Sequence, residues 1–175
     1  MRGKPKYYWC SCAFIRWLRG DNYNPGELEG FQEIVKQVEK NRAVLFTSAL
    51  TKSEVLEGKM TQDQRERFAK LFQKRSVVLV DITDKVLTLS KEIREWNSKI
   101  STPDAIHLAT AILYEAEEFH TTDGGGKRKR AGDLIPLNGN VAGHRLRICI
   151  PRADQYGLLT GVDSLPIDIE KKRGS

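Results

Sequence analysis

The sequence predicts a three-layer α/β/α sandwich built on a mainly parallel sheet. Two observations predict this fold class. Five short apolar or β-rich runs are spread along the chain, and amphipathic helical patterns separate them. Most of these runs are too continuously apolar to be half-exposed, which is typical of parallel strands covered by helices on both faces. Strands that alternate with helices favour such a sandwich over an all-β architecture.

The five expected strands are KYYWC, AVLFTS, VVLVDI, EFHTT and LRICI, at residues 6–10, 43–48, 77–82, 118–122 and 146–150. The aromatic residues of the first strand are interpreted as core. One helix is expected directly after this strand and another near Thr51. Four further helical patterns, each with an apolar stripe, cover residues 26–40, 61–74, 84–96 (with Trp96 on the stripe) and 102–117. In the last, Thr102 is the expected N-cap and Pro103 the first helical residue.

Length and composition indicate one domain. The chain has 175 residues, of which 39% are hydrophobic and 30% charged, enough for a substantial core. It has no apolar run of about 18 residues or more, so no membrane span is expected. Three cysteines do not suggest a secreted disulfide framework, and we expect a cytoplasmic protein. The folded domain is expected to span residues 1–151, with a glycine-rich basic surface loop at 124–145. A C-terminal tail is expected at 152–175, and its end, residues 163–175, is expected to be loosely packed.

The net charge of +6 indicates an anionic partner, although charge alone does not separate RNA, DNA or an acidic protein from simple solubility. One basic cluster follows a run of glycines and is a candidate path for RNA phosphates: Lys127, Arg128, Lys129 and Arg130. Arg16, Arg19 and Lys52 are candidates to extend it. A solvated charge run explains the same residues equally well.

Acidic residues follow several of the predicted strands, where α/β sheets gather their active sites. Glu54 lies after the second strand, Asp104 opens the helix at 102–117, and Asp123 ends the fourth strand. Cys10 ends the first strand. Carboxylates brought together in this way repel one another, so a hard divalent cation, Mg²⁺ or Mn²⁺, would explain the cluster.

Each of these acids also has a purely structural interpretation. Glu54 completes a capping box with Thr51. Asp104 in a first helical turn gains from the helix dipole. Asp123 before glycine is a common turn residue. Convergence at one edge of the sheet distinguishes the two interpretations.

The segments YYWCSCAFI, LFTSALTKSEVLEGK, STPDAIHLATAI and EFHTTDGG, in this order, resemble the motifs of the PIN-domain family. The resemblance covers roughly residues 6–151, and its most specific part is PDAIHLATA. It implies a Rossmann-like sandwich and a metal-dependent ribonuclease that uses Mg²⁺ or Mn²⁺. Many bacterial and archaeal members are VapC-type toxins, which pair with an antitoxin and are often homodimers.

By motif match, the resemblance assigns Glu54, Asp104 and Asp123 to the metal site and to catalysis. It assigns Ser11, Thr121 and Thr122 to the hydroxyl residues beside the site acids. Cys10 departs from the pattern, which has Asp at this position. A thiol is mostly neutral at pH 7, and sulfur is a poor ligand for Mg²⁺, so the resemblance implies an activity weakened or lost.

Cys10 and Cys12 form a C-x-C pair, but structural zinc needs about four clustered ligands. Zinc is disfavoured, because Cys149 lies in the last predicted strand and no histidine stands at a ligand interval. Cys12 and Cys149 are expected to be buried and inert. His107 is expected at a helix surface or the edge of the core.

Two other classes of function stay open. One is a catalytically inactive PIN module that binds RNA or a protein partner, which Cys10 favours. The other is an unrelated doubly wound domain that binds a nucleotide. The second is disfavoured, because neither G-x-G-x-x-G nor G-x-x-x-x-G-K-[ST] occurs.

Overall fold

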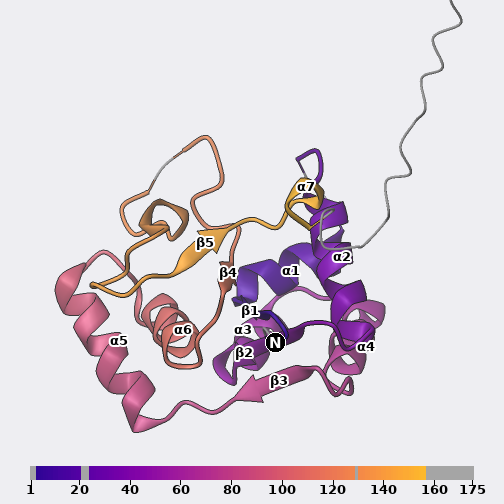
Figure 1. Cartoon of the computed structure of the whole chain (residues 1–175), viewed down its shortest axis with the longest axis horizontal. Coiled ribbons are helices and arrows are strands. Elements are labelled where there is room, and N and C mark those ends of the chain that lie inside the picture. The colour runs from indigo at the N-terminus through magenta and orange to yellow at the C-terminus, as the bar shows by residue number, and fades with distance from the viewer. Residues whose placement is uncertain (1–2, 21–23, 129, 157–175) are drawn as a thin grey trace, which may run out of the picture.

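Strands and helices alternate along the chain as the sequence predicts (Figure 1). The computed structural model describes residues 3–20, 24–128 and 130–156. The strands are β1 (Lys6–Trp9), β2 (Val44–Ser48), β3 (Val77–Val80), β4 (Glu118–His120) and β5 (Arg147–Cys149). The helices are α1 (Ser11–Arg19), α2 (Glu27–Glu39), α3 (Leu50–Glu57), α4 (Gln62–Leu71), α5 (Asp84–Trp96), α6 (Thr102–Leu113) and α7 (Ala153–Tyr156), with the 3-10 helix η1 (Ile135–Leu137). Each strand falls within its predicted range.

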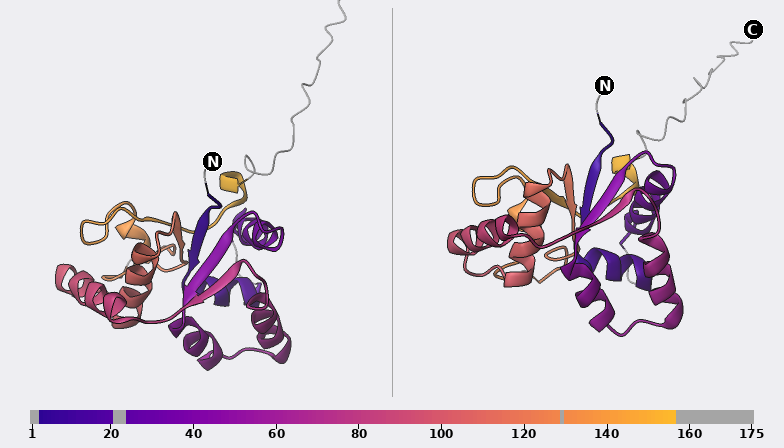
Figure 2. Two further views of the ribbon diagram at one scale, coloured as in Figure 1. Left: turned by 60° about the horizontal axis from the view of Figure 1, so that its bottom comes forward. Right: turned by 90° about the horizontal axis from the view of Figure 1, so that it is seen from below.

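The five strands form one sheet in the order β3-β2-β1-β4-β5, and every described pair is parallel. Helices α1, α2 and α4 lie on one side of the strands, and α5 and α6 lie on the other (Figure 2). The predicted α/β/α sandwich is therefore confirmed. The chain moves outward from β1 to β3 and then returns to the other side of β1 for β4. The carboxyl ends of β1 and β4 thus flank the switch point, where α/β sheets bind ligands.

The aromatic residues of β1 lie in the core, as predicted. Trp9 is fully buried and packs edge-on against Phe14 of α1 and Phe31 of α2, with ring centroids 5.1 and 5.2 Å apart. Tyr8 stacks on Phe119 of β4 at 5.1 Å. These contacts tie the central strand to its neighbouring strand and to the helices above it, and so hold the end of β1 in place.

Two local predictions about helix ends are wrong. The N-cap of α6 is Ser101 rather than Thr102, because the Ser101 hydroxyl accepts the Asp104 backbone N–H at 3.2 Å. Pro103 is accordingly the second helical residue. Trp96, placed on the buried stripe of α5, is 47% exposed, since the helix ends at this residue and no further turn continues the stripe.

The expected surface loop at 124–145 is partly packed. Leu134 and Val141 are buried, and the Asp133 carboxylate accepts the Arg130 backbone N–H at 2.7 Å. Gly124 has a φ of 85°, and a Cβ at this position would lie 2.9 Å from the Asp133 Cβ. The segment therefore needs glycine where it leaves Asp123, and it returns into the core before β5.

Residues 153–156, at the start of the expected C-terminal tail, form α7. Tyr156 is 1% exposed, and its hydroxyl donates a hydrogen bond to the Glu118 carboxylate at 2.6 Å. The Ala153 N–H donates to the Gly26 carbonyl at 3.0 Å, which docks α7 on α2. Residues 157–175 of the expected tail lie outside the described residues, and the domain boundary stays a prediction. Over the described ranges, no helix is both long and apolar enough to span a membrane.

Gly30 is the point where α7 and the segment before it approach α2, and we expect Gly30→Ala to destabilise the protein. A Cβ on Gly30 would lie 2.5 Å from backbone atoms of Pro151 and Arg152. This overlap outweighs the helix propensity of alanine, so the free energy of unfolding should fall by about 1–3 kcal/mol in urea denaturation. Gly126→Ala is the matched control, because its Cβ would meet nothing within 4 Å. Equal stability of the two variants would contradict this packing.

Candidate active site

The predicted site residues line one pocket beyond the carboxyl ends of the strands. Its volume is about 370 Å³, and it is lined by Cys10, Ser11, Cys12, Ile15, Glu54, Asp104, His107 and Asp123. Cys10 follows β1, Glu54 lies in α3, Asp104 in the first turn of α6, and Asp123 follows β4. Four elements far apart in sequence therefore bring three carboxylates and a thiol to the switch point of the sheet.

Glu54 faces the pocket instead of capping its helix. α3 begins at Leu50, so Glu54 lies in its second turn, and the Thr51 hydroxyl contacts that of Thr47 at 2.6 Å. Thr51 is therefore not the N-cap, and the capping-box interpretation of Glu54 is wrong. The Ser11 hydroxyl and His107 Nε2, the latter at 2.7 Å, both contact Glu54 Oε2. Burial alone would raise the pKa of Glu54, but these hydrogen bonds hold it below its ordinary value. Glu54 is therefore a fixed, charged carboxylate.

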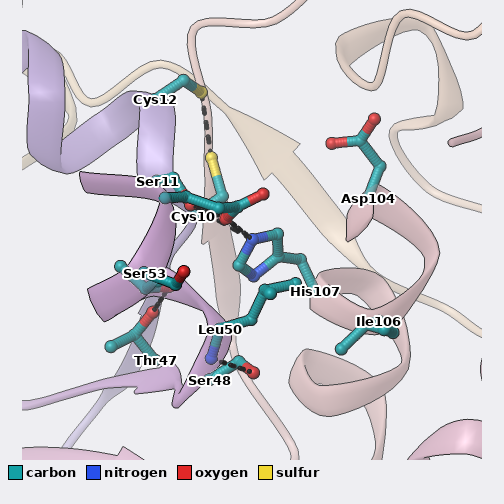
Figure 3. Close-up of polar contacts among 12 residues, drawn as sticks. Cys10, Ser11, Cys12, Thr47, Ser48, Leu50, Ser53, Asp104, Ile106 and His107 are labelled. Atoms are coloured by element: carbon teal, nitrogen blue, oxygen red, sulfur yellow. Dashed lines mark hydrogen bonds and ion pairs between the residues drawn. The ribbon is translucent and has the colours of Figure 1, made fainter. Parts of the chain in front are cut away.

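His107 is a site residue that the sequence interpretation missed. It is 2% exposed and extends from α6 towards Ser11 (Figure 3). The Ser48 N–H donates to the Tyr8 hydroxyl at 3.2 Å, and that hydroxyl contacts His107 Nδ1 at 2.6 Å. With Nδ1 accepting from Tyr8, Nε2 carries the proton that Glu54 accepts. The spacing of three residues from Asp104 was the available signal, because it puts both on one helix face.

Asp104 approaches the pocket from the first turn of α6, and Asp123 approaches it from the turn after β4. The Ser101 hydroxyl donates to Asp104 Oδ2 at 2.5 Å, and the Leu134 N–H donates to Asp123 Oδ2 at 3.2 Å. Burial raises the pKa of Asp123, and the negative charges of Asp104 and Asp133 raise it further. The expected repulsion between site acids thus contributes to the raised pKa of Asp123, whereas hydrogen bonds lower the pKa of Glu54.

Two thiols occupy the remaining corner of the pocket. Cys10 is the N-cap of α1, and its Sγ lies 2.9 Å from Cys12 Sγ (Figure 3). Cys12 Sγ also lies 3.0 Å from the Thr121 hydroxyl and accepts the Thr122 N–H at 3.3 Å. Burial raises the pKa of Cys10, so its thiol stays neutral.

Cys12 has the opposite character. The hydrogen bond from the Cys10 thiol, with the contacts to Thr121 and Thr122, lowers the pKa of Cys12 to about 6. Cys12 is only partly buried, so the expectation of a buried thiol is wrong at this position. The Ser11 hydroxyl contacts the Glu54 carboxylate. Thr121 and Thr122 both contact the Cys12 sulfur, and the Thr121 hydroxyl also accepts the Asp123 backbone N–H.

A second group of potential ligands lies on the other side of β4. Glu118, His120 and Cys149 offer ligand atoms within 4.8 Å of one another. The Trp9 indole donates to His120 Nδ1 at 3.0 Å, so Nε2 carries the ring proton and donates it to Glu118 at 2.8 Å. A protonated Nε2 is not a metal ligand. Glu118 also accepts from Arg147 at 2.8 Å and from Tyr156, so this group is a hydrogen-bonded anchor for α7.

The basic candidates differ in their surroundings. Lys127, Arg128 and Arg130 are exposed on the loop that follows Asp123. Arg19, at the end of α1, is exposed too. Lys129 lies outside the described residues. Arg16 forms an ion pair with the buried Glu27 at 3.4 Å, and the Lys52 ammonium lies 5.4 Å from the centre of the Phe72 ring. Arg16 and Lys52 thus have partners of their own, although the Lys52 side chain is exposed, and the loop residues place exposed positive charge directly after Asp123.

A profile of the PIN domain family matches residues 11–131, which is more than half of the chain. The chain belongs to the PIN domain family, which confirms the resemblance seen in its motifs. The matched range includes Glu54, Asp104 and Asp123 and begins one residue after Cys10.

Solved structures support the same fold. A chain of VapBC2 from Rickettsia felis, solved bound to a DNA fragment from their promoter, has a TM-score of 0.55 and 13% identity, covering 82% of this chain and 97% of its own. A chain of a toxin-antitoxin complex from Klebsiella pneumoniae has a TM-score of 0.50 and 19% identity, and the match covers 74% of this chain and 97% of that one. No curated protein sequence matches the chain. At these identities the likeness concerns the fold alone.

The raised pKa of Asp123 gives a direct test of the carboxylate cluster. We expect Asp104→Asn to lower the pKa of Asp123, because a neutral amide removes one of the charges that oppose its ionisation. Carboxyl ¹³C NMR titration of the chelator-treated protein measures this value. Asp63→Asn on the exposed side of α4 is the control and should leave it unchanged. An unshifted Asp123 in both variants would mean that the two acids do not share a pocket.

Proposed function

We propose that this chain is a PIN-type endoribonuclease, dependent on Mg²⁺ or Mn²⁺, that hydrolyses RNA phosphodiester bonds and whose activity is weakened by Cys10. The observation that carries the proposal is the pocket in which Glu54, Asp104 and Asp123 meet at the switch point of the sheet. Family membership supports a nuclease, and the fold shared with toxin–antitoxin chains supports a toxin-like role.

Three of the four residues that would surround a cation in the pocket offer ligands suited to a hard divalent ion. Glu54, Asp104 and Asp123 offer carboxylate oxygens. Burial raises the pKa of Asp123, and so do the negative charges of Asp104 and Asp133, which a cation would offset. The hydrogen bonds to Glu54 both use Oε2 and leave Oε1 to face a ligand. Cys10 does not fit, because it offers a neutral sulfur. When bound, the cation supplies Lewis-acid polarisation of the phosphate and a more acidic water.

The carboxylates differ in their suitability as proton acceptors. Glu54 is the weaker choice, since two hydrogen bonds already stabilise its charge and lower its pKa. Asp123 has a raised pKa, which favours proton transfer from an attacking water. We therefore assign proton acceptance to Asp123 or Asp104, and orientation of the pocket through Ser11 and His107 to Glu54.

The loop after Asp123 provides a path for an anionic strand. Lys127 and Arg128 are exposed, and they follow Asp123 by only a few residues, so phosphates held there would lie beside the pocket. The same loop is anchored at Asp123 through the Leu134 N–H. Binding by these residues would be sensitive to salt and largely independent of base sequence.

A catalytically inactive module that binds RNA or a protein partner is the second candidate. The observation that favours it is the buried, neutral thiol of Cys10 at the corner where the family has an acid. Such a module needs no cation, and it should hold RNA equally well with and without EDTA.

An antitoxin is the proposed protein partner, and a groove on the helical face supports it. The groove has a volume of about 250 Å³ and is lined by Trp17, Val35, Glu39, Arg67, Lys70, Leu71 and Lys74. Its apolar floor and charged rim suit an amphipathic segment of another chain. A homodimer and a cytoplasmic location stay predictions.

Restoring the acid is the central test. We expect Cys10→Asp to raise Mg²⁺- or Mn²⁺-dependent cleavage of RNA by roughly tenfold or more, which needs only about 1.4 kcal/mol of extra transition-state stabilisation. Cleavage of a fluorescent single-stranded RNA, with and without EDTA, measures the effect.

The matched control is made in the restored background. Cys10→Asp combined with Asp104→Asn should lose the gained activity, whereas Cys10→Asp combined with Asp63→Asn should keep it. If the restored protein cleaves no faster than its Asp104→Asn derivative, the chain is not a nuclease of this type. RNA binding unaffected by EDTA would then support the inactive module.

The basic loop should determine how RNA affinity responds to salt. We expect Lys127→Ala combined with Arg128→Ala to weaken binding and to reduce the slope of log K against log salt by about 1.4, since each phosphate contact to a single strand contributes about 0.7. Fluorescence anisotropy at several salt concentrations measures the slope. Lys91→Ala combined with Lys85→Ala, on α5, removes equal charge elsewhere and should leave the slope nearly unchanged. If both double variants changed the slope equally, the salt dependence would come from the net charge of the protein and not from the basic loop.

A further inference from the structure

We propose that Cys10 and Cys12 form a reversible disulfide inside the pocket, and that they are a modification site for low-molecular-weight disulfides such as oxidised glutathione. The juxtaposition that supports this is a pair of thiols in contact at the first turn of α1, one buried and one open to the pocket. Disulfide formation is independent of whether the pocket hydrolyses RNA.

The geometry of the pair is close to that of a bond. The two sulfurs lie 2.9 Å apart, so they need to approach by about 0.9 Å to reach a disulfide length near 2.0 Å. Cys10 is the N-cap and has extended backbone angles, with φ −78° and ψ 173°. Its carbonyl accepts the N–H groups of Ala13 and Phe14, and a rotation of its side chain leaves these helix bonds intact.

The surroundings of Cys12 favour its thiolate, which is the reactive form. Its Sγ accepts the Thr122 N–H and contacts the Thr121 hydroxyl, and both contacts stabilise negative charge on sulfur. It also lies in the first turn of α1, where the helix dipole has the same effect. Cys12 is partly exposed at the pocket, so a small disulfide can reach it. A low-pKa, accessible thiol beside a second thiol is the arrangement of thiol-based redox sensors.

The two thiols have different parts in the reaction. The Cys12 thiolate attacks one sulfur of the small disulfide, whose S–S bond breaks and releases one thiol that takes up a proton. Cys10, which is 3% exposed, then loses its proton and attacks the Cys12 sulfur, and the second small thiol leaves. In total the protein loses two electrons and two protons, and the small disulfide is reduced to two thiols.

Cys149 gives an internal comparison within the same chain. It lies on β5 beside Glu118, and burial together with that charge raises the pKa of Cys149 to about 12. Its thiol is therefore a poor nucleophile, and among the described residues no hydrogen bond joins it to another cysteine.

Oxidation would also change the pocket. Once Cys12 Sγ is bonded to Cys10, it is a weaker acceptor for the Thr122 N–H and the Thr121 hydroxyl. These two residues lead directly into Asp123, whose N–H donates to the Thr121 hydroxyl at 3.1 Å. The disulfide therefore alters the loop that positions one of the three acids.

The test is thiol mapping of the folded full-length chain. The reduced protein is equilibrated with glutathione and its disulfide at a series of ratios, quenched with acid, alkylated and digested with trypsin. Residues 7–16 form one tryptic peptide with both thiols, and Cys149 falls in another. We expect the 7–16 peptide to become two hydrogens lighter and to resist alkylation, while Cys149 is alkylated throughout. Chain unfolded in urea should lose this preference.

Variants separate the two parts of the reaction. Cys10→Ser should trap Cys12 as a mixed disulfide with glutathione, Cys12→Ser should leave Cys10 unmodified, and Cys149→Ser should behave as wild type. Circular dichroism checks that each variant is folded, and the wild-type mapping needs none of them. Free thiols in the 7–16 peptide at the most oxidising ratio, or oxidation of Cys149 before this pair, would overturn the proposal.

Discussion

The parallel pairing of β1 with β4 is the constraint on which the site depends. Trp9 lies opposite His120 in the register, and the Cys10 N–H donates to the His120 carbonyl at 3.3 Å. This pairing puts the start of α1 beside the loop that carries Asp123. The hydrogen bond from the Trp9 indole to the His120 ring adds a side-chain lock in the core. A slip of one residue between these strands would turn each side chain of the slipped strand to the opposite face of the sheet. It would also separate the two halves of the pocket.

The polar contacts within the pocket have different effects on Glu54 and on Asp123. A chain of hydrogen bonds from Ser48 through Tyr8 and His107 ends on Glu54, so a buried network orients that carboxylate from behind. Asp123 accepts the Leu134 N–H, yet burial and the neighbouring negative charges raise its pKa and so oppose its ionisation. The sulfur corner adds no charge at Cys10, and so the pocket is less anionic than one with a fourth acid. In the proposed nuclease, this difference would lower the affinity for a cation.

Much of the fold could be predicted from the sequence because its signals are local. Continuous apolar strands and amphipathic helices gave the sheet and its layers, and the acids fell at the strand ends where the topology brings them together. The role of His107 could not be read, because its partners Tyr8 and Glu54 are distant in sequence. The contact between Cys10 and Cys12 depends on how the first helical turn orients two side chains. The docking of α7 depends on Gly30, whose lack of a side chain matters only once residues 151–152 cross it.

The position of α7 has a consequence for the order in which the protein folds during synthesis. Glu118 is buried beside β1, yet two of its partners, Arg147 and Tyr156, come later in the chain. Until they emerge from the ribosome, the His120 ring is the one partner of this carboxylate, among those that the structure describes, that can offset the cost of desolvation. The β1–β4 half of the core is therefore incomplete until nearly the whole described chain has been made. A nascent chain that stalls before Tyr156 would expose an unfinished edge to chaperones or proteases.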